Sequence, residues 1–251
     1  MDFGFHERRV LVTGATGGIG SAVARAFSAE GARVALTYRT QRDTAEQLAA
    51  ELGGGADRAM AVRYALDEPD SPESAVHAIE QRWGGVDILV ANAVHRLPRR
   101  GADAHFEQVP PESWRSFVTD NLAGTLGTVS AVLPGMRERR WGRIVLVSSH
   151  VVRDGQRGQE FYAAVKSALH GFARSLAWDT GPYGIPVNVL CPGLTTTPGV
   201  LANLPATVLE RELAGTPSGR LSTPEEMADA VLLLASNANL TGEAITVSGG
   251  R

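Results

Sequence analysis

Near its N-terminus the chain reads Val10-Leu11-Val12-Thr13-Gly14-Ala15-Thr16-Gly17-Gly18-Ile19-Gly20, an apolar run followed directly by a glycine-rich turn. A helical pattern begins at Ile19, and a second apolar run follows at residues 33–37. Glycines between a strand and a helix let the backbone approach a pyrophosphate, whose charge then lies against the exposed N–H groups of the helix N-terminus. The stretch therefore predicts a nucleotide-binding βαβ unit, although turns also need glycine for their own geometry.

The same alternation of short apolar runs and helical patterns continues along the whole chain. Strands are predicted at residues 9–12, 33–37, 58–62, 87–91, 143–148, 186–190 and 244–247. Helices are predicted at residues 19–29, 44–52, 72–82, 111–137, 161–180 and 224–235. Alternation of this kind is typical of a parallel sheet covered on both faces. We therefore predict an α/β fold in which residues 1–251 form a single domain around a doubly wound, seven-stranded parallel sheet.

Composition excludes several classes of protein. The 251 residues are 43% hydrophobic and 20% charged, and the formal net charge of −3 argues against a nucleic-acid binder. No apolar run approaches the roughly 20 residues of a membrane helix, and the acidic N-terminus does not read as a secretory signal. The single cysteine, Cys191, permits no intramolecular disulfide. We expect a cytoplasmic protein without a metal site and without membrane or nucleic-acid partners.

Three segments between the predicted elements are distinctive. Gly53, Gly54 and Gly55 are interpreted as a helix stop. Residues 97–105 read as a polar loop. Residues 194–217 follow a predicted strand and form a connection longer than a simple turn, which is typical of a substrate-binding loop. Its apolar residues suggest a lid over a hydrophobic substrate, namely Leu201, Leu204, Val208, Leu209 and Leu213.

The end of the second predicted strand favours one nicotinamide cofactor over the other. An acid at this place would bind the ribose 2′-hydroxyl of NAD, whereas an arginine accommodates the 2′-phosphate of NADP. Here the chain reads Tyr38-Arg39-Thr40, with no acid before Asp43. Arg39 and Thr40 therefore favour NADP(H). A solvated arginine at a strand end would look the same in the sequence.

The only lysine of the chain, Lys166, lies four residues after Tyr162 and therefore on the same face of a predicted helix. A phenol titrates near pH 10, and a neighbouring ammonium stabilises the phenolate and lowers that value. The pair is thus suited to proton transfer to or from a carbonyl oxygen. Ser149, at the end of a predicted strand, could bond the same oxygen, and Asn121 could hold a water that feeds protons to Lys166. A lone serine or asparagine is more often a polar group of a turn or of the core, so Ser149 and Asn121 are persuasive only as part of the set of four.

Taken together, these segments resemble the short-chain dehydrogenase/reductase family in its single-domain Rossmann form. The matching segments, in order, are 13–20, Ala91-Asn92-Ala93, Asn121, Ser148-Ser149, 162–166, Cys191-Pro192-Gly193, Thr241-Gly242-Glu243 and Ser248-Gly249-Gly250. The resemblance covers essentially the whole chain. It implies an oxidoreductase that moves a hydride between a nicotinamide cofactor and a carbonyl or alcohol.

By this resemblance each site residue has an expected role. The catalytic residues would be Asn121, Ser149, Tyr162 and Lys166. NADP(H) would be bound by Gly14, Thr16, Gly18, Ile19, Gly20, Arg39, Thr40, Asp67 (at the adenine), Asn92, Ala93, Tyr162, Lys166, Pro192, Gly193, Thr195 and Thr197. The substrate would be bound by Ser149, His150, Gln159 and Tyr162.

The most similar branch is that of the 3-oxoacyl-carrier-protein reductases and polyketide ketoreductases, which Gln159 also matches. Arg139 and Arg140 correspond to a basic segment that docks an acidic acyl carrier protein in that branch. A second such segment has Tyr183 in place of arginine. Three other positions depart from the family pattern. Val94, followed by His95, replaces the glycine that usually follows Asn-Ala, and Gly17 stands where many NADP-dependent members have a basic residue. Ser248 replaces the aspartate of the final Asp-Gly-Gly.

We therefore expect an NADPH-dependent ketoreductase acting on a 3-oxoacyl or polyketide-type carbonyl. The alternatives are an NAD(P)-dependent dehydrogenase of another small or cyclic alcohol, and a non-catalytic NADP(H)-binding sensor. An enoyl-reductase spacing is disfavoured because no tyrosine lies six residues before Lys166, and no Gly-x-Ser-x-Gly elbow supports a serine hydrolase at Ser149. Polar residues before Tyr162 (His150, Arg153, Asp154 and Arg157) read equally well as substrate contacts or as a solvated loop. The helices at 111–136 and 161–180 carry more apolar residues than one sheet face requires, and by the resemblance they would pack against a second subunit in a homotetramer or homodimer; burial within one subunit is the alternative.

Overall fold

The computed structural model of the chain describes residues 3–53, 57–95, 100–101 and 104–251. Within these residues seven strands form one sheet, in the order β3-β2-β1-β4-β5-β6-β7, and every neighbouring pair is parallel. The strands are β1 (Arg9–Val12), β2 (Arg33–Tyr38), β3 (Ala59–Arg63), β4 (Ile88–Ala91), β5 (Arg143–Val147), β6 (Val187–Pro192) and β7 (Ala244–Val247). The predicted seven-stranded α/β fold is confirmed.

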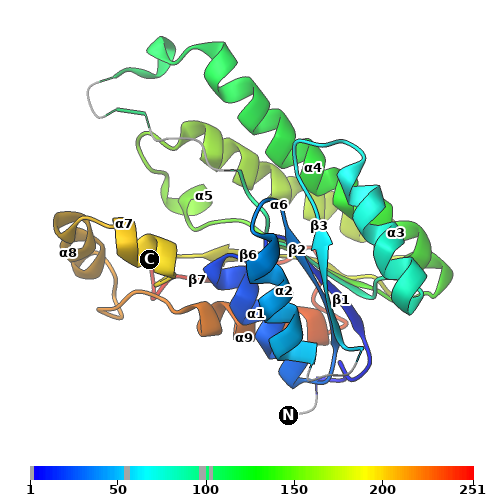
Figure 1. The fold of residues 1–251 in the computed structure, drawn as a ribbon. Helices are drawn as coiled ribbons and strands as arrows, with labels where there is room; N and C mark the ends of the chain where they lie inside the picture. The colour runs from blue at the N-terminus through cyan, green and yellow to red at the C-terminus, as the bar shows by residue number, and fades with distance from the viewer. Residues whose placement is uncertain (1–2, 54–56, 96–99, 102–103) are drawn as a thin grey trace.

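Helices cover both faces of this sheet (Figure 1). One face is packed by α1 (Gly18–Ala29), α2 (Arg42–Gly53) and α9 (Pro224–Ser236). The other is packed by α3 (Ser71–Trp83), α4 (Pro111–Glu138) and α6 (Glu160–Thr180). The strands are apolar on both sides because each face is buried under helices, as expected of a parallel sheet.

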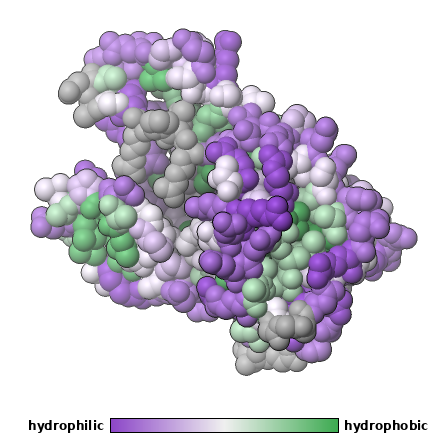
Figure 2. Space-filling model, viewed as in Figure 1, coloured by the Kyte–Doolittle hydropathy of each residue, from purple (hydrophilic) through white to green (hydrophobic). Residues whose placement is uncertain are grey.

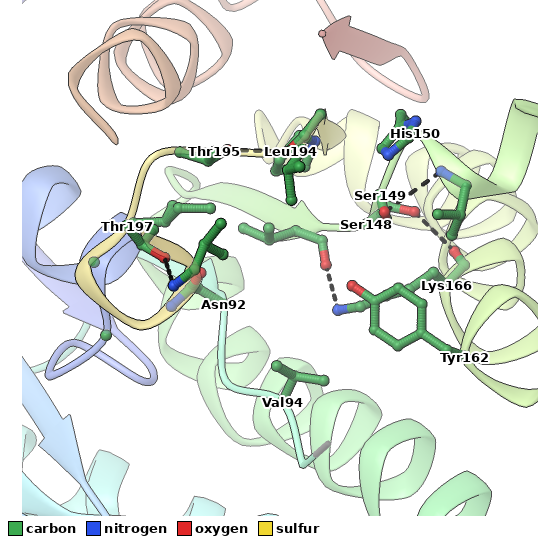
Figure 3. Close-up of a pocket in the computed structure, with 18 of the residues that line it drawn as sticks. Asn92, Val94, Ser148, Ser149, His150, Tyr162, Lys166, Leu194, Thr195 and Thr197 are labelled. Atoms are coloured by element: carbon green, nitrogen blue, oxygen red, sulfur yellow. Dashed lines mark hydrogen bonds between the residues drawn. The ribbon is translucent and has the colours of Figure 1, made fainter. Parts of the chain in front are cut away.

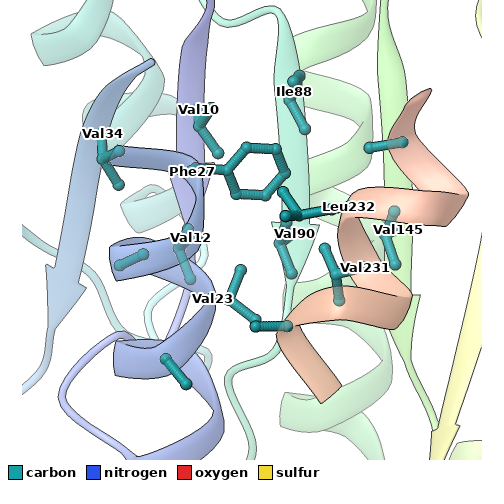
Figure 4. Packing of buried hydrophobic residues seen from close by; sticks show 14 of the residues in the cluster. Val10, Val12, Val23, Phe27, Val34, Ile88, Val90, Val145, Val231 and Leu232 are labelled. Atoms are coloured by element: carbon teal, nitrogen blue, oxygen red, sulfur yellow. The ribbon is translucent and has the colours of Figure 1, made fainter. Parts of the chain in front are cut away.

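The core on the first face shows how the sequence pattern becomes packing. Val23 and Phe27 of α1 lie against the strand residues Val10 and Ile88, and Figure 4 shows α9 completing the layer beside them. Phe27 is fully buried. Side chains four apart on a helix share one face, so the apolar spacing of α1 is what seats it on the sheet.

The strand order places a crevice at the carboxyl ends of β1 and β4. From β1 the chain proceeds outward to β2 and β3, and it then returns to the other side of β1 as β4. The connections after β1 and β4 therefore diverge, and in open parallel sheets ligands bind at this switch point. The glycine-rich turn follows β1, which places it at the crevice.

Residues 194–217 are more ordered than a loop. They contain α7 (Pro198–Asn203) and α8 (Ala206–Ala214), two helices that were not predicted within this long connection. Proline is the reason: Pro198 stands at the start of α7 and Pro205 caps α8, and proline at a helix start favours the helix although it reads as a breaker inside one. The Thr197 hydroxyl also caps α7 by accepting from the Val200 N–H.

The two ends of this segment are held together at the sheet. Thr195 forms an isolated parallel bridge with Ser222, and the Thr196 N–H donates to the Ser222 carbonyl at 2.9 Å. The Ser222 N–H in turn donates to the Leu194 carbonyl at 3.3 Å. Helices α7 and α8 therefore form an excursion that leaves and rejoins the fold at one place.

Three short elements were not predicted, and two predicted segments cannot be assessed. The helix α5 (Val151–Asp154) and the turns η1 (Phe106–Gln108) and η2 (Gly181–Tyr183) are too short for a periodic pattern. Gly53 still belongs to α2, and because Gly54 and Gly55 lie outside the described residues, the predicted helix stop is not tested; most of the predicted loop at 97–105 also lies outside them. Among the helices that the structure describes, none has the length and hydropathy to cross a membrane. The residues that the structure describes contain no cluster of His, Cys, Asp or Glu side chains suited to a metal ion.

A buried ion pair fastens the amino end of the sheet. The Asp87 carboxylate accepts from Arg9 Nε at 2.8 Å and from the Arg9 backbone N–H at 3.1 Å, and Arg139 Nε lies 3.4 Å from it. Burial raises the pKa of Asp87, but the hydrogen bonds and the charges of Arg9 and Arg139 outweigh burial and hold the pKa below its usual value. The ionised carboxylate is therefore the form that the fold stabilises.

Replacing Asp87 with asparagine is expected to lower the free energy of unfolding by about 3 kcal/mol at neutral pH, because two arginines lose their buried partner. Since the folded-state pKa is depressed, the contribution of Asp87 is present above its unfolded-state pKa of about 4 and is lost as the pH falls through the folded-state value. Urea denaturation at neutral pH and in acid measures both effects. Asp57→Asn is the control, because Asp57 pairs with Arg82 at the surface, and equal losses in the two variants would contradict the assignment.

Candidate active site

The glycine-rich turn brings bare backbone to the crevice. Gly14 has φ of +65°, and a Cβ there would lie 3.0 Å from the Ala93 Cα. A Cβ on Gly20 would lie 2.9 Å from the Ala15 Cα. Only glycine fits at these two positions, so the turn can pass close to β4 and leave the N-terminus of α1 open. The resulting cradle fits a pyrophosphate group, which binds to backbone N–H groups at such a helix start.

Asn92 and Thr13 join the two strands that border the crevice. The Thr13 hydroxyl accepts from the backbone N–H groups of Asn92 at 2.9 Å and Ala93 at 3.0 Å. The Asn92 side chain donates to the carbonyls of Thr13 at 3.0 Å and Gly14 at 3.2 Å. Asn92 thus fixes the carboxyl ends of β1 and β4 and also lines the cavity (Figure 3).

Lys166 and Tyr162 meet in a cavity of about 670 Å³ beside this crevice. Lys166 Nζ lies 5.8 Å from the centroid of the Tyr162 ring and donates to the Val147 carbonyl at 2.7 Å. Figure 3 shows both side chains pointing into the same space. Burial lowers the pKa of Lys166 to about 8, because an ammonium is disfavoured away from water.

Two consecutive serines at the end of β5 serve different sides of the structure. Ser148 turns inward, where its hydroxyl donates to the Lys166 carbonyl at 3.1 Å and lies 2.9 Å from His170 Nε2. Ser149 lines the cavity with Tyr162 and Lys166, and its Oγ accepts weakly from the Val151 N–H at 3.4 Å. Both serines line the cavity, but adjacent residues of an extended chain point to opposite sides, so the Ser148 hydroxyl is engaged by Lys166 and His170 while that of Ser149 is not.

Asn121 is not among the cavity-lining residues. Its Oδ1 accepts from the His95 backbone N–H at 2.8 Å, and its Nδ2 donates to the Phe117 carbonyl at 2.8 Å. The side chain, 3% exposed, therefore holds the segment that follows β4. The expected water-mediated link from Asn121 to Lys166 stays a prediction.

Most of the other expected cofactor and substrate residues converge on one surface. The larger cavity is lined by Gly14, Thr16, Gly18, Ile19, Gly20, Asn92, Ala93, Ser149, His150, Gln159, Tyr162, Lys166, Pro192, Gly193, Thr195 and Thr197. Arg39 and Thr40 line an adjoining cavity of about 390 Å³, which shares Gly14 and Thr16 with the first. Asp67 lines neither cavity, but its carboxylate lies 3.8 Å from Arg39 Nη1.

The substrate side of the larger cavity is partly apolar and partly polar. Apolar walls come from Leu194, Val200, Leu204 and Val208, and Figure 2 shows hydrophobic residues gathering over the α7–α8 segment. Leu201, an expected lid residue, is 59% exposed and does not line the cavity.

A polar side chain, that of His150, also lines this cavity. His150 Nδ1 lies 3.0 Å from the Asp154 carboxylate, and this contact holds the pKa of Asp154 below its usual value. Phe161 and Glu212 also line the cavity, although neither was predicted as a site residue. The position of Phe161 beside Tyr162 could have indicated it, whereas nothing in the local pattern of α8 marks Glu212.

Phe161 belongs to a stack of aromatic rings at the start of α6. The Trp114 ring lies 4.8 Å from it, nearly parallel at 11°, and the Phe106 ring lies 5.4 Å from it. Trp114 begins α4 and Phe106 lies in η1, so three separate segments meet here. The stack fixes the residue that precedes Tyr162.

The two arginines of the expected carrier-docking segment have different surroundings. Arg139 is turned into the fold, where its Nη2 donates to the Val86 carbonyl at 2.6 Å. Arg140 is exposed, and it bonds the Pro182 carbonyl at 2.8 Å with its guanidinium 5.6 Å from the Tyr183 ring. Of the pair, Arg140 is the one presented at the surface.

A parallel sheet with a glycine cradle at its switch point, and a tyrosine and a buried lysine beside it, defines a nucleotide-binding enzyme of the Rossmann type. A family model described as enoyl-(acyl carrier protein) reductase matches residues 14–251. A solved structure titled short chain dehydrogenase/reductase family protein is 34% identical, with a TM-score of 0.84 over 100% of this chain and 98% of that one. The chain belongs to the short-chain dehydrogenase/reductase family and is an oxidoreductase of the kind that uses a nicotinamide cofactor.

Two curated relatives match over nearly the full length. Acetoacetyl-CoA reductase of Shinella zoogloeoides is 36% identical over 249 residues, covering 98% of this chain and 98% of that protein. The 3-oxoacyl-(acyl-carrier-protein) reductase FabG of Escherichia coli (strain K12) is 37% identical over 248 residues, again covering 98% of each. Both names describe reduction of a 3-oxoacyl group on a thiol carrier.

Proposed function

We propose that the protein is an NADPH-dependent ketoreductase that reduces the ketone of a 3-oxoacyl or polyketide-type thioester to an alcohol. The observation that supports this most is the meeting of Ser149, Tyr162 and Lys166 in one cavity next to the glycine cradle. The names of the two curated relatives support the same substrate class. The separation of Tyr162 and Lys166 by one helical turn favours a ketone over the enoyl group named in the family description.

The residues of the chain perform the proton chemistry. When bound, the nicotinamide supplies the hydride that reaches the carbonyl carbon. The Ser149 hydroxyl donates a hydrogen bond to the carbonyl oxygen and orients it, and Tyr162 gives its phenolic proton to that oxygen. Lys166, whose buried ammonium has a pKa of about 8, stabilises the phenolate that forms. The remaining charge is neutralised as the phenolate regains a proton from solvent.

Arg39 supports NADP(H) as the cofactor. It stands at the end of β2, lines the smaller cavity next to the cradle, and offers a planar donor pair that suits a phosphate. No acidic residue is present at the same strand end. The positive charge of Arg39 therefore attracts the 2′-phosphate of NADP(H), whereas the uncharged 2′-hydroxyl of NAD(H) gains little from it.

The apolar wall from α7 and α8 supports a hydrophobic acyl or polyketide chain as substrate. Arg140 is the docking residue proposed for an acidic carrier protein, because Arg139 is engaged inside the fold. On α6, Trp178 is 85% exposed, and a large apolar side chain at the surface of this helix supports packing against a second copy of the chain, in a homodimer or homotetramer.

Oxidation of NADPH, followed by absorbance, is expected with an acetoacetyl thioester as substrate, and NADH is expected to support it less well. Replacing Arg39 with alanine is expected to raise the KM for NADPH about tenfold, because one partly exposed charge-assisted contact is lost, and to leave the KM for NADH unchanged. The bulky ketone trans-1-decalone, tested alongside, distinguishes linear from cyclic substrates.

Arg42→Ala is the matched control, since Arg42 pairs with Glu46 on α2 and lines neither cavity. Absence of turnover with both ketones, despite tight NADPH binding, would reject the ketoreductase proposal. If Arg39→Ala raised the KM for NADH as much as the KM for NADPH, the proposed role of Arg39 would be rejected.

A further inference from the structure

Three side chains from separate segments form a cluster beside the smaller cavity, which Arg39 and His95 line and Asp67 does not. Arg39 Nη1 lies 2.8 Å from His95 Nε2 and 3.8 Å from the Asp67 carboxylate. His95 Nε2 lies 3.5 Å from the same carboxylate. Arg39 follows β2, Asp67 follows β3 and His95 follows β4, so the cluster gathers side chains from the carboxyl ends of three strands, with β1 lying between β2 and β4.

His95 is the most firmly placed of the three. Its backbone N–H is bound by the buried Asn121 side chain at 2.8 Å. Its side chain is 22% exposed, compared with 52% for Arg39 and 44% for Asp67. Its imidazole also lines the cavity that contains the end of β2.

The contact between Arg39 and His95 depends on the charge of the imidazole. A guanidinium N–H can only donate, so the contact is a hydrogen bond only where Nε2 accepts, which a protonated imidazole cannot do. A phosphate placed between the two side chains would accept from both, and it would favour a protonated imidazole. The same phosphate would repel the Asp67 carboxylate, which is exposed enough to turn away.

We infer that His95 is a second cofactor-specificity residue, which binds the 2′-phosphate of NADP(H) together with Arg39 and takes up a proton as it does so. The inference rests on the proposed use of NADP(H). Histidine is the side chain that gains a proton most readily near neutral pH. Preference for NADPH over NADH is therefore stronger in mildly acidic than in mildly alkaline solution.

Other groups around the cluster do not supply this behaviour. Arg63 and Glu68 pair with each other, with Nη1 and Oε2 2.6 Å apart, so the Glu68 carboxylate that also feels Arg39 is already matched by a cation. Tyr38 and Tyr64 line the cavity, and the Tyr64 hydroxyl is bound by Thr128 at 2.7 Å. The phosphate itself gains negative charge as the pH rises above about 6, which would strengthen its attraction to Arg39 and oppose the proposed effect.

The test compares dissociation constants of NADPH and NADH at about pH 6 and about pH 8, in the intact protein and in His95→Gln. For the natural sequence the dissociation constant of NADPH is expected to rise about tenfold from the lower to the higher pH, because a charge-assisted contact is lost. The dissociation constant of NADH is expected to stay constant. In His95→Gln, which retains a polar side chain without a titrating charge, the dissociation constant of NADPH is expected not to rise with pH. His77→Gln, on the exposed side of α3, is the matched control and should follow the natural sequence.

Each outcome separates this inference from the proposed function. A pH-independent ratio of the two dissociation constants in the natural sequence, or a rise that persists in His95→Gln, overturns the role of His95. NADPH binding no tighter than NADH at both pH values overturns NADP(H) use itself. Unchanged NADH binding by His95→Gln shows that the variant is folded, so a loss confined to NADPH supports the inference.

Discussion

Tyr162→Phe is expected to lower kcat for ketone reduction by a factor of about a thousand while NADPH still binds. The phenol is the proposed acid and lines the same cavity as Ser149 and Lys166, and phenylalanine keeps the ring but has no proton to give. Hydride transfer to a carbonyl carbon without protonation of the oxygen would leave an unstabilised alkoxide. Steady-state rates with saturating NADPH, together with a titration of NADPH binding, measure the two quantities separately.

Tyr183→Phe is the matched control for this variant. Tyr183 lies in η2, where its ring packs against the guanidinium of Arg137 at 4.6 Å, and it does not line either cavity. It should retain the turnover of the natural sequence. If Tyr162→Phe did the same, the proton would have to come from another group, and the proposed chemistry would be wrong.

Lys166→Met is expected to lower kcat by about a hundredfold or more, since the phenolate loses the neighbouring ammonium. The variant is also expected to be at least as stable as the natural sequence. Burial lowers the pKa of Lys166 to about 8, so folding at neutral pH has to place an ammonium where it is disfavoured. Methionine fills a similar space without that cost, and the free energy of unfolding could rise by about 2 kcal/mol.

The pH dependence of stability gives an independent check on Lys166. Because its folded-state pKa lies below the ordinary value of 10.5, the unfolded chain binds the proton more tightly between about pH 8 and that value. The penalty is therefore fully present below about pH 8 and fades as the pH rises, so the two proteins should converge in alkali. Urea denaturation at neutral and alkaline pH measures this. A variant that is less stable at neutral pH would show that the bond from Nζ to the Val147 carbonyl outweighs burial.

Local patterns were sufficient to predict the sheet and the cavity. The glycine-rich turn predicted the crevice because only glycine meets the close approach between Gly14 and Ala93. The pair Tyr162 and Lys166 could be placed together because a helical turn brings residues four apart onto one face. The same local reasoning failed at α7 and α8, where prolines that start helices were interpreted as signs of a loop.

Contacts between residues distant in the chain could not be predicted. Arg139 was expected at the surface, but it lies against Asp87, which precedes it by more than fifty residues. The bond from the His95 backbone to Asn121 likewise depends on how α4 crosses the end of β4. Periodicity and motif spacing describe one element at a time, so they contain no information about such pairings.

The paired ends of the α7–α8 excursion bear on how the enzyme could be altered. Leu194, Thr195 and Thr196 are bonded to Ser222, and these bonds form a short seam that closes the excursion at the sheet. The seam does not depend on the residues of α7 and α8 that lie between its two sides. A graft from a homologue could replace the intervening helices without reshaping the strands or the cradle, since closure of the excursion depends on the seam. Substrate range and hydride chemistry would then be inherited as separate modules, and evolution could exchange one while conserving the other.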